Sequence, residues 1–395
     1  MITTPVTADL VHGAIDLEST GRGLRPHRLP QAVRERDADQ QLTLVEAQPS
    51  GVRVVVATAA RQLVLEVHAA RTAYRGMDRP RGAVDVVLDG SVHLTRTLTA
   101  GDVLELDPRT GSSVFTAGTV DRIDVGGLPP GEKVVEFWLP HNEQVDLVAL
   151  SSDASVRAVP STRPVWLHHG SSISQGSNAA SPTATWPAVA ARRAGVQLVN
   201  LGFGGSAVAD PFTARVVRDA PADVISIKLG INVVNLDAMR LRTFVPAVHG
   251  FLDTVREGHP TTPLLLISPI HCALHEDTPG PGAFDPTAQG TGSVRFIATG
   301  RQGDTAHGRL TLEVIRRALL EVVERRRQDP HLHHLDGQTL YGQDDAEQFP
   351  LPDGLHPDTA THALMGERFA TTAFAAGGPF ETARSHAGRP SGPVA

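Results

Sequence analysis

Two patterns of hydrophobic and polar positions divide the chain. From about residue 51 to 151, short β-branched stretches alternate apolar and polar positions, and turns containing Gly or Asp, such as Asp89-Gly90, separate them. Short strands at this spacing are typical of an antiparallel sandwich. The pattern predicts an N-terminal, jelly-roll-like β-sandwich domain over residues 1–158. The first 50 residues look irregular, and we expect them to wrap around the sandwich.

After a polar linker at residues 153–164, apolar strands alternate with amphipathic helices. This alternation indicates an α/β domain with a parallel sheet that helices cover on both faces. We predict this domain over residues 159–376, followed by a disordered tail over residues 377–395. The predicted strands are 165–169, 196–201, 224–229, 264–270 and 331–335, and the predicted helices are 186–193, 236–256, 310–327 and 359–375.

Charge and composition narrow the classes of function. The net charge is −7 and the basic residues are scattered, which argues against a nucleic-acid partner and against an anionic membrane surface. No apolar stretch approaches the ~20 residues that cross a bilayer, and the N-terminus lacks the features of a secretory signal. Cys272 is the only cysteine, which excludes an intrachain disulfide. We therefore expect a soluble, cytoplasmic protein whose oligomeric state the sequence leaves open.

Four short motifs place chemically useful residues at strand ends or just before a helix. Gly170-Ser171-Ser172 follows the first strand of the α/β domain, where the carboxyl edge of a sheet exposes a nucleophile. The glycine-rich segment 200–206 follows the second strand and lets backbone N–H groups approach a ligand. Gly230-Ile231-Asn232 ends the third strand, and its amide can donate to an oxyanion. In Asp353-Gly354-Leu355-His356 the spacing lets the carboxylate reach the imidazole Nδ1.

Each motif also has a simpler interpretation. Gly-Ser-Ser turns are common, Asn232 could cap a turn, and the last motif could be a polar loop before a helix that Asp358 caps. Gly202-x-Gly204-x-x-Ala207 also mimics a dinucleotide fingerprint, but that fingerprint belongs on the first βα unit. In addition, Asp223 starts a strand, whereas the ribose-binding acid ends one. The ordered occurrence of all four motifs favours a catalytic site.

Together the motifs resemble the four blocks of the SGNH hydrolases, also called GDSL esterases/lipases. Gly170 to Ile173, with the later Gly176, matches the nucleophile block, and residues 200–205 match the second block. Residues 230–232 and 353–356 match the third and fourth blocks. The resemblance covers roughly residues 164–376 and implies a flavodoxin-like parallel sheet. Two positions depart from the family pattern, because Ser171 and Val233 stand where the family usually has Asp.

The resemblance implies a serine ester hydrolase that works through an acyl-enzyme intermediate. It makes Ser172 the nucleophile, His356 the base and Asp353 the residue that orients the base. It implies oxyanion donors at the N–H of Ser172, the N–H of Gly205 and the side chain of Asn232. It calls for no metal and no organic cofactor.

The expected partner is a small-molecule ester, and the absence of a long apolar lid helix favours short acyl groups. A sandwich ahead of an SGNH domain looks like the layout of some carbohydrate acetyl esterases. Acetyl-like esters of a carbohydrate or a small metabolite are therefore the expected substrates. Acyl transfer by the same triad and a non-catalytic binding protein with a degenerate hydrolase domain are the alternatives.

Other candidate residues have weaker patterns. His168 and His169 are adjacent on a strand and point to opposite faces, so we expect core residues and not a metal pair. The histidines at 331, 333 and 334 lack partners that would complete a zinc site. The long segment 271–308 is either a lid or acyl-pocket wall, or an inert polar loop. Trp138 and residues 141–143 either face a cleft between the domains or pack in the core.

Overall fold

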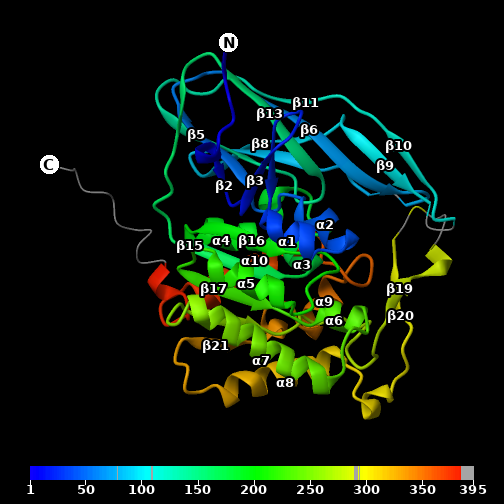
Figure 1. Cartoon of the computed structure of the whole chain (residues 1–395). Helices are drawn as coiled ribbons and strands as arrows, with labels where there is room; N and C mark the ends of the chain where they lie inside the picture. Colours follow the sequence, from blue (N-terminus) through cyan, green and yellow to red (C-terminus); the bar gives the residue numbers. More distant parts are fainter. Residues whose placement is uncertain (78, 108–109, 289–291, 293, 384–395) are drawn as a thin grey trace.

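The computed structural model describes residues 1–395 except 78, 108–109, 289–291, 293 and 384–395. A β-sandwich forms one end of the molecule, and an α/β domain forms the other (Figure 1). The predicted fold class is confirmed for both domains. None of the helices in the described part of the chain is long and apolar enough to cross a membrane.

Two mainly antiparallel sheets make up the N-terminal domain. Within the described residues one sheet has the order β10-β9-β6-β13-β4-β3, with β1 beside β13 and β11 beside β6, and the other has the order β14-β5-β12-β7-β8, with β2 beside β5. The inner faces of both sheets share one core of Val, Leu, Ile and Phe side chains, as alternating strands require. The strands are β1 (Ile2–Thr4), β2 (Val11–His12), β3 (Asp16–Ser19), β4 (Leu24–His27), β5 (Arg53–Thr58), β6 (Leu63–Tyr74), β7 (Ala83–Leu88), β8 (Ser91–Thr97), β9 (Asp102–Leu106), β10 (Ser113–Thr116), β11 (Asp121–Val125), β12 (Lys133–Trp138), β13 (Gln144–Ser152) and β14 (Val156–Ala158).

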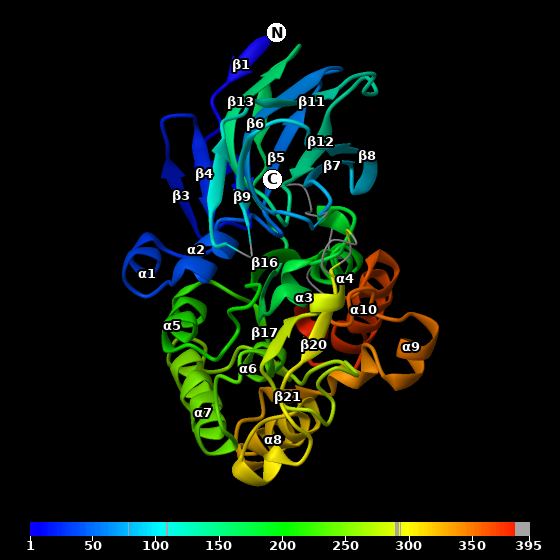
Figure 2. The same cartoon turned by 90° about the vertical axis from the view of Figure 1, so that its right-hand side faces the viewer.

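The first 50 residues are more regular than the sequence suggested. Besides the 3-10 turn η1 (Ala8–Leu10), they form strands β1 to β4 and two short helices, α1 (Gln31–Arg36) and α2 (Gln40–Glu46). These helices lie between the sandwich and the α/β domain (Figures 1 and 2). The predicted linker is also partly regular, because β14 pairs with β5. Short polar strands that depend on a distant partner carry little signal of their own.

Five parallel strands form the central sheet of the C-terminal domain, in the order β16-β15-β17-β18-β21. This is the flavodoxin-like order. The chain adds β16 on one side of β15 and all later strands on the other side, and this reversal of strand order leaves a crevice at the carboxyl ends of β15 and β17, where such sheets bind ligands. The strands are β15 (Val165–Gly170), β16 (Gln197–Gly202), β17 (Val224–Lys228), β18 (Leu264–Ile267) and β21 (Leu332–Leu335), and a separate pair consists of β19 (Gly282–Phe284) and β20 (Phe296–Ala298).

Helices cover both faces of this sheet, as predicted. Helices α5 and α7 lie on one side of the sheet, and α4 and α10 lie on the other (Figure 2). The helices are α3 (Ser172–Gln175), α4 (Trp186–Ala194), α5 (Pro211–Asp219), α6 (Ile231–Asn235), α7 (Leu241–Gly258), α8 (Leu312–Arg325), α9 (Gln343–Gln348) and α10 (Thr359–Ala373), with 3-10 turns η2 (Pro182–Ala184), η3 (Pro286–Ala288), η4 (Asp304–His307) and η5 (Gly337–Thr339).

The ends of these helices reflect local sequence signals. Helix α4 begins after Thr185, carries Pro187 in its first turn and ends at Gly195, whose φ of 72° is left-handed. Asp358 caps α10 by accepting from the N–H of Thr361 at 2.8 Å. Helix α5, which the sequence analysis missed, starts at Pro211. Its 9 residues are fewer than the roughly 10–12 over which periodicity distinguishes a helix from a strand.

The predicted tail begins too early. Phe380 is fully buried, and its ring lies 5.3 Å from that of Phe374 and 6.3 Å from that of Phe369. Burial of one such side chain contributes about 1.5–3 kcal/mol, which fixes residues 377–383 against the sheet-covering helices. The rest of the predicted tail, residues 384–395, lies outside the described residues.

A buried carboxylate joins the two domains. Asp85, on β7, accepts hydrogen bonds from the hydroxyl and the N–H of Thr183 at 2.6 and 2.9 Å and from the hydroxyl of Ser181 at 2.6 Å. Thr95 donates to its other oxygen at 2.5 Å. Four donors therefore depend on one fully buried side chain.

We predict that Asp85→Ala lowers the free energy of unfolding by about 2–4 kcal/mol, because it leaves the buried N–H and hydroxyl of Thr183 without an acceptor. Chemical denaturation followed by circular dichroism measures the change. Asp124→Ala is the control, because that side chain is 65% exposed. Equal unfolding free energies for the two variants would show that the carboxylate does not couple the domains.

Candidate active site

Ser172 lies at the turn between the first parallel strand and the short helix α3. Strand β15 ends at Gly170, and Ser171 caps the helix by accepting from the N–H of Ile173 at 3.4 Å. Ser171, at the position where the family usually has Asp, thus serves as the N-cap of this helix. Gly176 ends the helix with a φ of 116°, and a Cβ there would lie 2.2 Å from Thr185 Cγ2. Both ends of this helix are therefore fixed, and the half-buried Ser172 side chain is presented at the carboxyl edge of the sheet.

The loop before α10 folds a carboxylate back onto an imidazole. Asp353 Oδ2 accepts from His356 Nδ1 at 2.8 Å, and Oδ1 accepts from the N–H groups of His356 and Leu355 at 2.7 and 2.9 Å. Gly354 permits this tight turn with a φ of 81°. Burial raises the pKa of Asp353, but the hydrogen bonds and the charge of His356 outweigh it and lower the pKa to about 2. The carboxylate is therefore ionised at neutral pH.

The structure brings all three predicted triad residues together. His356 Nε2 lies 2.9 Å from Ser172 Oγ, although the two residues are 184 positions apart in the sequence. Since Nδ1–H donates to Asp353, Nε2 is left to accept the serine proton. Asn178 adds a contact that the sequence did not predict, because its Nδ2 donates to Asp353 Oδ2 at 3.1 Å. A lone Asn in a polar turn gives no signal for such a role.

The three predicted oxyanion donors lie just after three neighbouring strands of the sheet, Ser172 after β15, Gly205 after β16 and Asn232 after β17. A Cβ placed on Gly204 would lie 3.5 Å from Ser172 Cβ, which shows how closely the 203–205 loop approaches the serine. Asn232 is buried, and its Oδ1 accepts from the N–H of Ala207 at 3.1 Å, which directs Nδ2 elsewhere. Within the described residues, the N–H groups of Ser172 and Gly205 and the Nδ2 of Asn232 have no protein acceptor. They are available for a negatively charged oxygen.

Side chains from the N-terminal domain hold the end of β16. Arg28 is fully buried and donates to the carbonyl oxygens of Asn200 and Gly202, and its guanidinium lies 4.9 Å from the centre of the Phe203 ring. Ser50 accepts from Asn200 Nδ2 at 2.9 Å. The sequence analysis missed these residues because nothing near residues 28–50 marks them as part of a site.

Gln175, one turn after the serine, links three parts of the chain. Its Oε1 accepts from the N–H of Gly204 at 2.8 Å. Its Nε2 donates to Gln48 and to the carbonyl oxygen of His141. The segment 141–143 thus contacts the α/β domain, as one of the two interpretations expected. Trp138 packs in the core, where its Nε1 donates to Glu136 at 2.9 Å.

The long segment 271–308 forms an arm beside the site. Strands β19 and β20 project along one side of the molecule toward the sandwich (Figure 1), and Gly292 pairs with Met77 of the N-terminal domain. The N–H of Phe296 donates to the carbonyl oxygen of Asp353 at 2.9 Å, and the Phe296 ring meets His356 edge-on at 5.5 Å. The segment therefore contacts the imidazole, which favours a wall of the site over an inert loop.

The remaining candidates are structural. His168 bonds to Ser226 and Ser174 at 2.7 and 2.8 Å, and His169 stacks on Phe251 with ring centres 5.8 Å apart. They point to opposite faces of the sheet, as predicted. Burial lowers the pKa of His169 to about 4. Among the described residues no group of three or more His, Cys, Asp or Glu is placed to hold a metal.

Comparison with known proteins gives a family match within each domain. Residues 162–276 match the GDSL-like lipase/acylhydrolase family, and residues 10–148 match the N-terminal domain of SsfX3. No protein of curated function matches the sequence.

Solved structures extend the similarity over both domains. A salicylyl-acyltransferase, SsfX3, from a tetracycline biosynthetic pathway is 26% identical, with a TM-score of 0.76 over 93% of this chain and 95% of the other. A GDSL-like lipase from Bacteroides ovatus (19% identity, TM-score 0.66, covering 91% and 93%) and a family two carbohydrate esterase from Clostridium thermocellum (16%, 0.55, covering 82% and 90%) share the fold. With its family match over residues 162–276, its shared fold and its four motifs, the α/β domain belongs to the SGNH hydrolase (GDSL esterase/lipase) superfamily.

Proposed function

We propose that the protein is a serine ester hydrolase in which Ser172, His356 and Asp353 act as a catalytic triad. The observation that carries the proposal is the unbroken chain of hydrogen bonds from Asp353 through His356 to Ser172, with distances of 2.8 and 2.9 Å. A serine hydroxyl is a weak nucleophile unless a base removes its proton, and the base works only in the correct tautomer. The membership in a superfamily of esterases and acylhydrolases supports the same reaction class.

The first half of the reaction acylates the serine. Ser172 Oγ attacks the ester carbonyl carbon while His356 Nε2 takes its proton, and the ionised Asp353 stabilises the imidazolium that forms. The carbonyl oxygen becomes an oxyanion, which accepts hydrogen bonds from the N–H groups of Ser172 and Gly205 and from Nδ2 of Asn232. His356 then protonates the leaving alcohol as the ester C–O bond breaks.

The second half releases the acid. A water molecule loses a proton to His356 Nε2 and attacks the acyl carbon. The same three donors stabilise the second oxyanion. Collapse of the intermediate breaks the bond to Ser172 Oγ, which regains its proton from His356. Because all donors are held before the substrate arrives, little reorganisation accompanies either step.

For the substrate we propose a short acyl group on a carbohydrate or a small metabolite. Gly204 approaches the serine without a side chain, and Phe296 closes the space beside the imidazole. A panel of p-nitrophenyl esters from acetate to octanoate, followed by sugar acetates, tests this choice. Turnover that rises with chain length would contradict the short acyl group while leaving the triad intact.

The similarity to a salicylyl-acyltransferase over both domains favours acyl transfer as a second candidate. In that reaction an alcohol or amine replaces water in the second half. We predict that the protein is a hydrolase. In that case the amount of carboxylic acid released from a p-nitrophenyl ester equals the amount of p-nitrophenol released, even when acceptor alcohols are added. Chromatography of the products measures the partition. If a new ester accounts for most of the released p-nitrophenol, the enzyme is a transferase. A binding protein with a degenerate site would release none.

We predict that Ser172→Ala removes essentially all esterase activity, because no other hydroxyl has the hydrogen bond to His356 within the described residues. Hydrolysis of p-nitrophenyl acetate measures the loss, and circular dichroism checks the fold. Ser113→Ala, on the exposed strand β10, is the matched control. Near wild-type turnover by Ser172→Ala would end the proposal.

We predict that Asn232→Ala lowers kcat by about 10²–10³-fold, because one oxyanion donor is lost. KM should change little, since the donor acts mainly on the charged intermediate. Steady-state kinetics with the best ester from the panel separates the two constants. An unchanged kcat would limit Asn232 to its structural hydrogen bond with Ala207.

A further inference from the structure

Both backbone polar groups of Gly204 are held by glutamine side chains. Its N–H donates to Oε1 of Gln175 at 2.8 Å, and its C=O accepts from Nε2 of Gln41 at 2.9 Å. Gln175 lies on the helix that starts at Ser172, whereas Gln41 lies on α2 of the N-terminal domain. A residue of the N-terminal domain therefore acts directly on the loop that approaches the serine.

The bond from Gln41 also determines where the next N–H points. The C=O of Gly204 and the N–H of Gly205 belong to one planar trans peptide group, so they point in opposite directions. Neither glycine has a Cβ, and Gly205 has a φ of 74°, so this peptide group can rotate at little steric cost. Such a rotation would replace the N–H donor at the oxyanion position with a carbonyl oxygen. The carbonyl oxygen of Gly204 would then repel the oxyanion that the N–H of Gly205 would otherwise stabilise.

We propose that Gln41 is a positioning residue that holds the Gly204–Gly205 peptide group with its N–H toward the oxyanion. The inference rests on the proposed function, because it assigns a task only if Gly205 donates to an oxyanion. Gln41 also packs on Gly205, since a Cβ there would lie 3.4–3.7 Å from the end of the Gln41 side chain. The N-terminal domain thus contributes to transition-state stabilisation without touching the substrate.

Helix α2 is anchored firmly enough for this role. Asp39 caps its first turn by accepting from the N–H of Leu42 at 2.7 Å. At its other end, the buried carboxylate of Glu46 accepts from His27 Nδ1 at 2.7 Å and from the N–H of Arg28 at 3.2 Å. A short helix with both ends fixed holds its side chains in place before the substrate binds.

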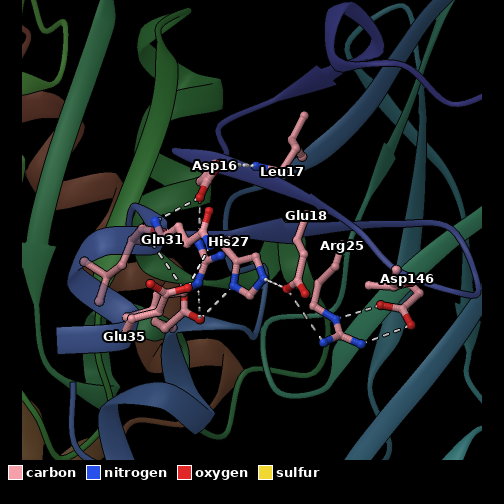
Figure 3. Close-up of polar contacts among 12 residues, drawn as sticks. Asp16, Leu17, Glu18, Arg25, His27, Gln31, Glu35 and Asp146 are labelled. Carbon is pink, nitrogen blue, oxygen red and sulfur yellow. Dashed lines mark hydrogen bonds and ion pairs between the residues drawn. The ribbon is translucent and has the colours of Figure 1, made fainter. Parts of the chain in front are cut away.

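The network behind α2 continues into the sandwich (Figure 3). His27 Nε2 lies 2.9 Å from Glu18 on β3, and Arg25 on β4 binds Asp146 on β13 through two hydrogen bonds of 2.7 and 3.1 Å. Asp16 accepts from the N–H of Gln31 at the start of α1 at 2.9 Å. The position of Gln41 is therefore set by the sheet of the N-terminal domain.

The Gln41 residue itself is exposed, so substitutions there should leave the fold intact. We expect Gln41→Ala to lower kcat by about 3- to 10-fold with little change in KM, which corresponds to one lost hydrogen bond. Gln41→Glu should lower kcat further, by at least another 3-fold. Its carboxylate repels the Gly204 oxygen and accepts from the Gly205 N–H, and so favours the rotated peptide group. Gln41→Lys restores a donor and should recover most of the kcat lost in Gln41→Ala.

The matched control is Gln40→Glu, which adds the same charge at the neighbouring exposed position of α2. Steady-state kinetics on one ester, with thermal unfolding to check the fold, compares all four variants with the wild type. A kcat for Gln41→Glu equal to that of Gln40→Glu would overturn the inference. Absence of ester turnover in the wild type would instead contradict the proposed function, so the two failures are distinguishable.

Discussion

The site depends on one contact, the 2.9 Å hydrogen bond between Ser172 Oγ and His356 Nε2. It joins two loops that lie near the beginning and the end of the α/β domain in the sequence. The parallel sheet makes this contact possible. Every strand delivers its following loop to the same edge, so residues far apart in sequence meet there. Ser172 follows β15 at the switch point of the sheet, and the loop that carries His356 leads into α10.

The hydrogen bonds around Asp353 and His356 set the orientation of the imidazole and so decide which of its nitrogens faces the serine. Asp353 is fixed by two backbone N–H groups and by Asn178, so it holds the imidazole with Nε2 toward the serine. Its low pKa keeps the carboxylate charged at neutral pH, and the ionised form stabilises an imidazolium beside it. The proposed proton transfer therefore begins from a geometry that is already in place.

The N-terminal domain contributes side chains that hold the backbone around the candidate site. Arg28, Gln41, Gln48 and Ser50 all bond to the segment around the serine, to the end of β16 or to the loop that follows it. Buried Arg28 satisfies carbonyl oxygens that the end of β16 would otherwise leave unpaired inside the protein. The arrangement of the site is thus shared between domains. The similarity to SsfX3 likewise spans both domains.

The sequence predicted the site where the signal is local. Ser172, Asn232 and the pair Asp353 and His356 each lie in a short motif at a strand end or before a helix, so alternation of strands and helices was enough to bring them to one edge. Gln41 and Arg28 could not be found in this way, because their bonds depend on how the two domains meet. The same holds for β14, whose pairing partner lies about a hundred residues earlier.

The most direct test of this account is the location of a covalent adduct. The protein is incubated with a fluorophosphonate, digested, and mapped by mass spectrometry. Activation by His356 predicts a single adduct on Ser172 and none on its neighbours Ser171 and Ser174, which serve as a helix cap and as a partner of His168. An unmodified Ser172 in folded protein, or an adduct confined to another residue, would contradict the proposed catalytic site.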